Sequence, residues 1–318
     1  MDLRQLDMLV AIADHGSFSA AARSLHTVQS NVSSHIARLE REVGATCIDR
    51  STGRLTDEGQ AVVDRARRIQ SELDDLRSDV ASLRDQVSGR VRMGIIGTVA
   101  RWAVSPLLQA LADAHPGIDL VVLDATTTSL VPQLVAGGLD LAVINLPADH
   151  PDITFDPLFD EEAVLIAPEG HPLHDRERVT LADLAGVPLL LPAPGTSFRD
   201  DLDAAAAEHE IELTPRAEID GMRLLASLTF SGFGAAIVPA TAAPGWIGGT
   251  WRRIPVDGGV HRVVGIARRK RGMLSTPGRA VLEVLVEVLR THASDQESVA
   301  LGDGFNQPHA VVLASRAK

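Results

Sequence analysis

The sequence predicts a mixed α/β protein with an N-terminal all-α winged helix-turn-helix, a long coiled-coil linker helix and a C-terminal two-lobed α/β region. Three observations predict this architecture. Residues 3–43 carry apolar side chains at helical spacing, residues 62–87 repeat them with a heptad period, and short apolar strands alternate with helices beyond residue 89. The 318 residues are enough for two or three domains, each with its own core.

The N-terminal part is predicted to contain three helices. The first carries Leu3, Leu6 and Leu9 and ends near Gly16, because glycine commonly follows the last turn of a helix. Two further helices in residues 17–40 bury their apolar faces against each other, with His26 and Thr27 supplying a polar turn and an N-cap. These faces consist of Phe18, Ala21, Ala22 and Leu25 in one helix and of Val28, Val32, Ile36, Leu39 and Val43 in the other.

The opposite side of the second of these helices carries short polar side chains followed by a cation. Such side chains contact base edges and phosphates, so we predict that this helix lies in the major groove of DNA. The stretch TCIDRSTGRLT after it has extended pieces around a Ser-Thr-Gly turn, which is typical of a two-stranded wing. The predicted DNA-binding residues are Thr27, Gln29, Ser30, Asn31, Ser33, Ser34, His35, Arg38, Arg50 and Arg54.

The stretch LRQLDMLVAIADHGSFSAAARSLHTVQSNVSSHIARLEREVGATCIDRSTGRLTDEG resembles the winged helix-turn-helix of the LysR-type transcriptional regulators, and the likeness continues more weakly to about residue 292. The resemblance implies a ligand-responsive DNA-binding regulator that usually forms tetramers from two kinds of dimer. It also implies an effector-binding half similar in fold to periplasmic solute-binding proteins. The wing, residues 50–56, is shorter than the usual form, and Val28 stands where a serine is common, which shifts the capping to Thr27.

Charge alone does not predict a nucleic-acid partner. The formal net charge is −12, and residues 1–90 hold 12 arginines against 14 acids. The cations are concentrated locally, and most acids fall on the linker helix, so we expect only a modest salt dependence of DNA binding. The arginines of this cluster are Arg23, Arg38, Arg41, Arg50 and Arg54.

The linker helix is predicted to form a dimer. Its apolar residues are separated by 4, 3, 4, 3, 4, 3 and 4 positions from Val62 to Val87, which is a heptad seam. The alternative is a long surface helix packed on its own domain. A two-fold axis through the seam would place two recognition helices on the same side of a duplex and favours an inverted-repeat operator. The predicted dimerisation residues are Val62, Ile69, Leu73, Leu76, Val80 and Leu83.

Domain boundaries follow from these patterns. We assign residues 1–58 to the winged helix-turn-helix, 59–88 to the linker helix and 89–292 to the effector-binding domain, with Ser88 and Gly89 as a hinge. The first lobe takes 89–162 and 265–292 and the second takes 163–264, so the chain crosses near Glu161 and returns near Val264. Residues 293–318 are expected to be disordered.

Clustered hydroxyls follow several predicted strands of the two lobes. Ligands of open α/β sheets bind outside the carboxyl ends of strands, where helix N-termini present free N–H groups, although each hydroxyl by itself is also an ordinary N-cap. We therefore predict a cleft for a small polar or anionic metabolite such as a carboxylate. Arg101 and Arg199 are close enough in the sequence to pair with it, and the alternative is that they are solvated surface residues. The predicted effector-binding residues are Thr98, Thr127, Thr128, Ser129, Asn145, Thr196, Ser197, Phe198 and Met222.

The composition also bears on the ligand. Aromatic residues make up only 3% of the chain and there is no tyrosine, which argues against a large stacked aromatic ligand, although Trp102 and Phe198 are expected to border the cleft. The single cysteine, Cys47, is interpreted as a small buried hydrophobe, with thiol sensing as the alternative. The run RRKR at 268–271 is interpreted as a solvated strand end, with a secondary DNA or oligomer contact as the alternative.

No cofactor, metal or catalytic residue is predicted. The loop histidines His150, His171 and His174 lack a pattern of carboxylate or cysteine partners, and no G-x-S-x-G, P-loop or H-E-x-x-H motif is present. One alternative is a solute-binding protein, which leaves residues 1–87 without a purpose. The other is an enzyme on the two-lobed scaffold, for which no convergent acid, base or nucleophile residues are found. Neither a signal peptide nor a run of about 18 apolar residues is found, so we expect a cytoplasmic protein with no membrane partner.

Overall fold

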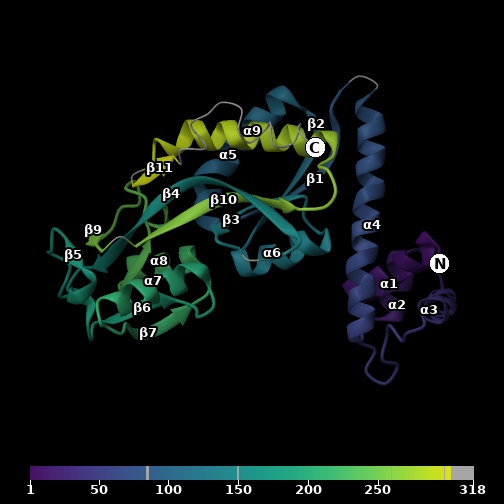
Figure 1. Cartoon of the computed structure of the whole chain (residues 1–318), viewed down its shortest axis with the longest axis horizontal. Helices are drawn as coiled ribbons and strands as arrows, with labels where there is room; N and C mark the ends of the chain where they lie inside the picture. Colours follow the sequence, from purple (N-terminus) through teal and green to yellow (C-terminus); the bar gives the residue numbers. More distant parts are fainter. Residues whose placement is uncertain (84–85, 149, 259, 297, 302–318) are drawn as a thin grey trace. The chain divides into compact units, whose positions relative to one another are not determined.

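The computed structural model describes residues 1–83, 86–148, 150–258, 260–296 and 298–301. They form two compact units, one made chiefly of Met1–Arg77 and the other made chiefly of residues from Ser78 onward. Along the chain, the long helix α4 (Asp57–Ser82) leads from the first unit to the second (Figure 1). Within the described ranges, no helix combines the length and the apolar character that a membrane span requires.

The first unit is a helical bundle closed by the start of α4. Asp2 and Gln5 form a reciprocal capping box at the first helix, and Gly16 ends that helix with a φ of 74°, as the sequence predicted. The core includes Leu9, Ile36 and Leu39, none of which is exposed. The helices before α4 are α1 (Leu3–His15), α2 (Phe18–Ser24) and α3 (Gln29–Val43).

The predicted apolar face of α3 is wrong at two positions, Val28 and Val43. Val28 is 65% exposed because it is the N-cap of α3, with extended backbone, and therefore lies outside the helical periodicity. Val43 is the last helical residue and is 39% exposed. Thr27 does not cap the helix either, because its Oγ1 accepts a hydrogen bond from the Asn31 side-chain amide at 3.0 Å.

Helix α4 is shorter than the seam suggested. It ends at Ser82, so Leu83 follows the helix, and Val87 lies just before the first strand. Ser88 and Gly89 belong to strand β1, so the helix break comes before the hinge that we predicted there. A long apolar repeat does not by itself fix the residue at which a helix ends, because the repeat continues into the following apolar strand.

The first lobe of the second unit is a mixed sheet with strand order β2-β1-β3-β10-β4, parallel from β2 to β3 and antiparallel beyond. Helices α5 and α9 pack against each other, and α6 lies on the opposite side of the sheet in Figure 1. The elements of this lobe are β1 (Ser88–Ile95), α5 (Gly97–Ala114), β2 (Gly117–Asp124), α6 (Thr127–Ala136), β3 (Leu141–Leu146), β4 (Ile153–Pro168), β10 (His261–Arg269) and α9 (Thr276–Ala293).

The second lobe continues the same sheet through β8, β6 and β7, with β9 also paired to β4. The sequence predicted that short apolar strands alternate with helices in this region, but β5, β7 and β9 lack a clear alternation of apolar and polar residues and were not predicted. The elements of this lobe are β5 (Val179–Thr180), η1 (Leu181–Leu184), β6 (Pro188–Pro192), α7 (Ser197–Glu208), β7 (Thr214–Ile219), α8 (Met222–Phe230), β8 (Ala235–Pro239), η2 (Ala240–Ala242) and β9 (Trp251–Asp257).

Strands β4 and β10 connect the two lobes. Strand β4 pairs with β10 up to Glu162 and with β8 from Ala163, so the chain crosses where the sequence predicted. The expected disordered tail after residue 293 is wrong for one short piece, because β11 (Val299–Leu301) pairs with β4 around Asp160. The rest of that expectation, residues 302–318, lies outside the described residues.

Candidate functional site

The polar side of α3 is presented to solvent. Gln29, Ser30, Ser34 and Arg38 are exposed, while Asn31, Ser33 and His35 are half-buried. Val28 provides no side-chain cap, so among the described residues no side chain takes up the first N–H groups of α3. Free N–H groups at a helix N-terminus bind phosphate, and the neighbouring polar side chains are of the kind that reads bases.

Helix α2 positions the start of α3. The Ser19 hydroxyl donates to Gln29 Oε1 at 2.8 Å, which joins the two helices at the turn. His26 adopts a left-handed φ of 51° in that turn. The Nδ1 atom of His35 is buried without a hydrogen-bond partner among the described residues, so part of that ring is held in the protein rather than presented for recognition.

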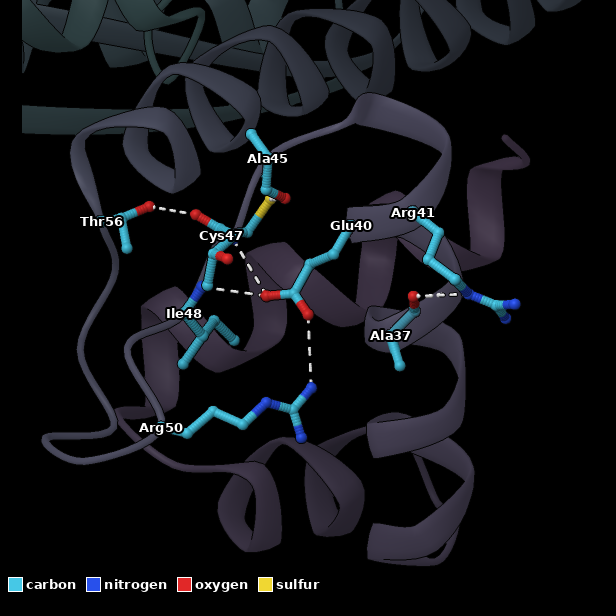
Figure 2. A network of polar contacts seen from close by, with 9 residues as sticks. Ala37, Glu40, Arg41, Ala45, Cys47, Ile48, Arg50 and Thr56 are labelled. Atoms are coloured by element: carbon cyan, nitrogen blue, oxygen red, sulfur yellow. Dashed lines mark hydrogen bonds and ion pairs between the residues drawn. The ribbon is translucent and has the colours of Figure 1, made fainter.

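Figure 2 shows how Glu40 of α3 fixes the wing. Its Oε1 accepts hydrogen bonds from the backbone N–H groups of Cys47 at 2.9 Å and Ile48 at 3.3 Å, and its Oε2 pairs with Arg50 at 3.3 Å. One carboxylate therefore joins α3 to the segment that enters the wing. This contact also means that Arg50 is already paired in the free protein.

The predicted two-stranded wing is a short antiparallel hairpin, in which the Asp49 N–H donates to the Arg54 carbonyl at 2.9 Å and the Thr56 N–H donates to the Cys47 carbonyl at 3.0 Å. A single bridge joins Ile48 and Leu55. Asp49 accepts hydrogen bonds from the hydroxyls of Ser51 and Thr52 and from the Ser51 backbone, which lowers the pKa of its carboxyl to about 2. The exposed Arg54 at the end of this turn makes no ion pair within the described part of the chain.

Cys47 is fully buried in the same network. Burial raises the pKa of its thiol, and the carboxylates of Glu40 and Glu58 raise it further. The thiolate is the reactive form of cysteine, so this environment disfavours redox chemistry. The geometry supports the interpretation of Cys47 as a small core residue.

Several residues of the predicted seam on α4 are exposed in the single chain. The exposed fractions are 38% for Ile69, 61% for Leu76 and 49% for Val80, while Leu73 is half-buried. Val62 is half-buried against the core of the first unit. An apolar stripe left open along a helix is what a coiled-coil partner would cover.

A cavity of about 260 Å³ lies between the two lobes of the second unit. The N-terminal ends of α5, α6, α7 and α8 line this cavity, and each of these helices follows a strand or loop at the same end of the sheets. Eight of the nine predicted effector-binding residues line this cavity: Thr98, Thr127, Thr128, Asn145, Thr196, Ser197, Phe198 and Met222.

The structure differs from the predicted cavity lining at three residues, Ser129, Phe198 and Trp102. Ser129 does not line the cavity, and its hydroxyl accepts a hydrogen bond from Thr126 at 3.2 Å. Phe198 lines it, but its side chain is only 1% exposed and packs in the core of the second lobe. Trp102 does not border the cavity, because it packs against Phe159 with ring centroids 5.9 Å apart.

The two arginines that we expected to meet a ligand are engaged elsewhere. Arg101 is not part of the lining and donates to the carbonyl of Ala242 at 3.2 Å. Arg199 donates to Asp203 and Glu218 and to the carbonyl of Pro192. Neither arginine lines the cavity.

A different arginine, Arg262 of β10, forms the floor of the cavity. Its guanidinium donates to Glu161 Oε2 at 2.9 and 2.6 Å, to Thr98 Oγ1 at 2.6 Å and to Asn145 Oδ1 at 3.1 Å. Glu161 also accepts from the backbone N–H of Thr241 at 2.6 Å. The pair is almost completely buried, and it joins residues of both lobes at the point where the chain crosses.

A second charged pair lies in the lining of the cavity. Arg223 at the start of α8 pairs with Asp124 at the end of β2, so the pair spans the two lobes. Sequence reasoning missed Arg262, Glu161 and Arg223. Glu161 stands between Asp160 and Glu162, and Arg262 follows His261, so neighbouring residues in the sequence do not mark either position as buried. Buried charges are rare unless paired, and the structure identifies this pair.

The comparisons with known proteins agree with this geometry. Residues 3–60 match the family model described as bacterial regulatory helix-turn-helix protein, lysR family, and residues 84–290 match the model described as LysR substrate binding domain. The chain therefore belongs to the LysR family of transcriptional regulators, which are DNA-binding proteins with an effector-binding domain and not enzymes.

Two curated relatives are regulators of transcription. The chain is 31% identical over 246 residues to the DNA-binding transcriptional dual regulator OxyR of Escherichia coli K12, covering 77% of this chain and 81% of the relative. It is 32% identical over 298 residues to a probable hydrogen peroxide-inducible genes activator of Mycobacterium leprae, covering 90% of this chain and 94% of the relative. The similarity thus extends over both units.

Solved structures show the same fold. A full-length OxyR variant from Pseudomonas aeruginosa matches with a TM-score of 0.72 and 26% identity, covering 95% of this chain and 98% of that one. CbnR complexed with its target DNA matches with a TM-score of 0.68 and 24% identity, covering 92% of this chain and all of that one. The effector-binding domain of QuiR in complex with shikimate matches with a TM-score of 0.58 and 22% identity, covering 64% of this chain and 99% of that one.

Proposed function

We propose that this regulator responds to a small polar or anionic metabolite held in the cavity between its lobes. The observation that carries the proposal is the convergence of helix N-termini on that cavity. Helices α5, α7 and α8 begin there, and none of the three has a side-chain cap within the described residues. Uncapped N–H groups and the positive ends of helix dipoles stabilise an anion, and the surrounding hydroxyls add polar contacts.

The charges of the lining refine the ligand class. The lining holds two arginines, Arg262 and Arg223, and two aspartates, Asp124 and Asp220. Arg223 pairs with Asp124, and Arg262 pairs with the buried Glu161. The side chains therefore supply no surplus positive charge, and the helix N-termini must provide the attraction. A monoanion such as a carboxylate with hydroxyl substituents fits this balance. The volume is just below the roughly 300 to 1,000 Å³ of common ligand pockets, which favours a small metabolite.

Peroxide sensing through a disulfide within one chain is not supported, although several relatives are named for hydrogen peroxide. Such a disulfide requires two cysteines, and the chain has only Cys47. That residue is buried and its thiol pKa is raised, which opposes oxidation. A ligand in the cavity remains the better-supported signal.

On the DNA side, we propose that α3 enters the major groove and that a dimer formed through α4 recognises an inverted repeat. Support comes from the exposed polar side of α3 and the open apolar stripe of α4. Assembly of dimers into a tetramer is part of the proposal and is supported by the family. Cytoplasmic location follows from a function on DNA.

The mode of signalling follows from the buried network. A ligand that binds Thr98 or Asn145 competes with Arg262 for the same polar atoms, at the point where the strands cross between lobes. We propose that binding shifts the angle of the lobes and, through the oligomer, the separation of the DNA-binding units.

The experiment is a screen of small carboxylates and polyols by thermal shift with the full-length protein. A binder should raise the melting temperature of the wild type, and Thr127→Val should weaken its affinity at least tenfold while operator binding without ligand is retained. Ser129→Ala is the matched control, because this hydroxyl neighbours the cavity without lining it. If both variants lose the same affinity for the ligand, or if Thr127→Val keeps the wild-type affinity, the ligand does not bind in this cavity.

A further inference from the structure

A second cavity, of about 440 Å³, lies beside the turn between β10 and α9. Its cations come from one short segment, 268–279, which contains five lysines and arginines and no acid in a chain of net charge −12. We call these residues with their cavity the basic pocket. Its cations are Arg268, Arg269, Lys270, Arg271 and Arg279.

Two of these guanidinium groups are held in place without being neutralised. Arg269 donates to the carbonyl of Leu139 at 2.8 Å, and Arg279 donates to the carbonyl of Leu274 at 2.6 Å and to the Thr276 hydroxyl at 2.9 Å. Their hydrogen bonds go to neutral acceptors, so the positive charge remains available. Both side chains are half-buried, which makes their positions less mobile than those of free surface arginines.

The other cations add to this surplus. Lys270 and Arg271 are exposed and form no ion pair with any described residue. Arg268 pairs with Asp156, but its Nε atom is buried and finds no acceptor within the described ranges. The surplus positive charge of the basic pocket therefore comes from Lys270 and Arg271 together with Arg269 and Arg279.

The carboxylates of the basic pocket do not cancel its charge. Asp156 is already paired with Arg268, and Asp140 accepts a backbone hydrogen bond from Arg92 at 2.7 Å. Glu283 is the third carboxylate, so five cations face three anions. The pocket is therefore suited to a ligand with about two negative charges.

The first turn of α9 adds no negative charge to the lining of the basic pocket, although its N–H groups are capped by Ser275 and Asp79. This helix has 18 residues and no acid in its first turn, and Arg279 lies near that turn. Cations are unfavourable at a helix N-terminus because they add to the positive end of the dipole. Asp79 accepts the hydrogen bond of the Thr276 N–H at 2.6 Å, but it does not line the pocket.

We propose that the basic pocket binds the phosphate groups of a phosphorylated small molecule of about nucleotide size. Guanidinium groups match the geometry of phosphate oxygens, and a phosphate dianion balances the surplus charge. Leu274, Leu282 and the exposed Met273 supply apolar surface for the remainder of the molecule. The volume lies within the usual range for small ligands.

The test is calorimetric titration of the full-length protein with pyrophosphate and with ATP. The wild type should bind at least one of these probes, and K270A/R271A should weaken that affinity at least tenfold. Both residues are exposed, and within the described ranges their side chains make no hydrogen bond or ion pair with the protein, so the fold should be unaffected. The control R176A/R216A removes two exposed arginines of the same unit and should leave affinity within twofold.

Three results would overturn the proposal. The first is no binding of either probe by the wild type at millimolar concentration. The second is equal weakening in both double variants, which would indicate general electrostatic attraction. The third is a K270A/R271A protein that keeps its affinity for both probes but loses affinity for an operator duplex, which would assign these cations to the phosphates of DNA instead.

Discussion

The polar side of α3 and the floor of the interlobe cavity use similar residue types in opposite ways. On α3, Ser30, Ser34 and Arg38 are exposed, and Arg38 is paired only with Glu42, at 3.0 Å on the surface. In the cavity, Arg262 is 2% exposed and all its described contacts are with buried or half-buried groups. The exposed surface is free to exchange partners, whereas the buried network resists any single change.

This difference sets the expected cost of binding. In the proposed complex with DNA, Arg38 and Arg50 would exchange Glu42 and Glu40 for phosphate, so each would gain less binding free energy than a free cation. Arg54 has no such cost. The modest salt dependence predicted from the charge distribution therefore has a structural reason, because ion pairs within the protein compete with phosphate contacts.

The largest effect should come from the buried pair. Arg262→Ala leaves the Glu161 carboxylate buried without its partner, which should lower the free energy of unfolding of the second unit by about 3 to 5 kcal/mol. Urea denaturation of the full-length protein measures this. The double variant Arg262→Met with Glu161→Leu should recover most of the loss. A loss below about 1 kcal/mol for the single variant would mean that the pair is solvated.

The next effect concerns the stripe on α4. Replacing Leu73 and Leu76 by lysine should yield monomers and lower operator affinity by about 100-fold, because two linked DNA-binding units bind far more tightly than one. Sedimentation and fluorescence anisotropy measure the two consequences. Ala61→Lys with Ala81→Lys is the matched control, since it adds the same charge at exposed positions outside the seam. A dimer that survives the seam change contradicts the coiled-coil proposal.

A smaller effect is expected at α3. Ser33→Ala or Arg38→Ala should weaken operator binding by about 1 to 3 kcal/mol, and Arg38→Ala should also reduce the salt slope by about 1. Anisotropy titrations at several salt concentrations separate the two contributions. Arg65→Ala, which removes an exposed arginine of α4, is the control. If both α3 variants bind the operator with unchanged affinity, these side chains do not take part in DNA recognition.

The smallest effect is at Cys47. Because burial raises the pKa of its thiol above the ordinary 9.0, the native protein should react with a thiol reagent at pH 8 at least tenfold more slowly than the unfolded chain. Since the unfolded thiol ionises first, the protein should lose stability as the pH rises above about 9. Rapid labelling of native protein would place the thiol at the surface.

The sequence predicted the first unit better than the floor of the cavity for a physical reason. The helices of the first unit are fixed by local spacing, and errors arose only at helix ends such as Val28 and Ser82. The hydroxyl residues of the cavity were predictable because strand ends of α/β sheets meet at one edge. Arg262 was not, because its partners Thr98, Asn145 and Glu161 are 164, 117 and 101 residues away, and pairing over such separations leaves no local pattern.

The most direct test of the account is selection of duplexes from a random library with the full-length protein, followed by sequencing. We predict enrichment of an inverted repeat whose half-sites are separated by about one helical turn or a multiple of it. Enrichment of an unrepeated half-site, or of no sequence at all, would contradict a pair of recognition helices held by α4.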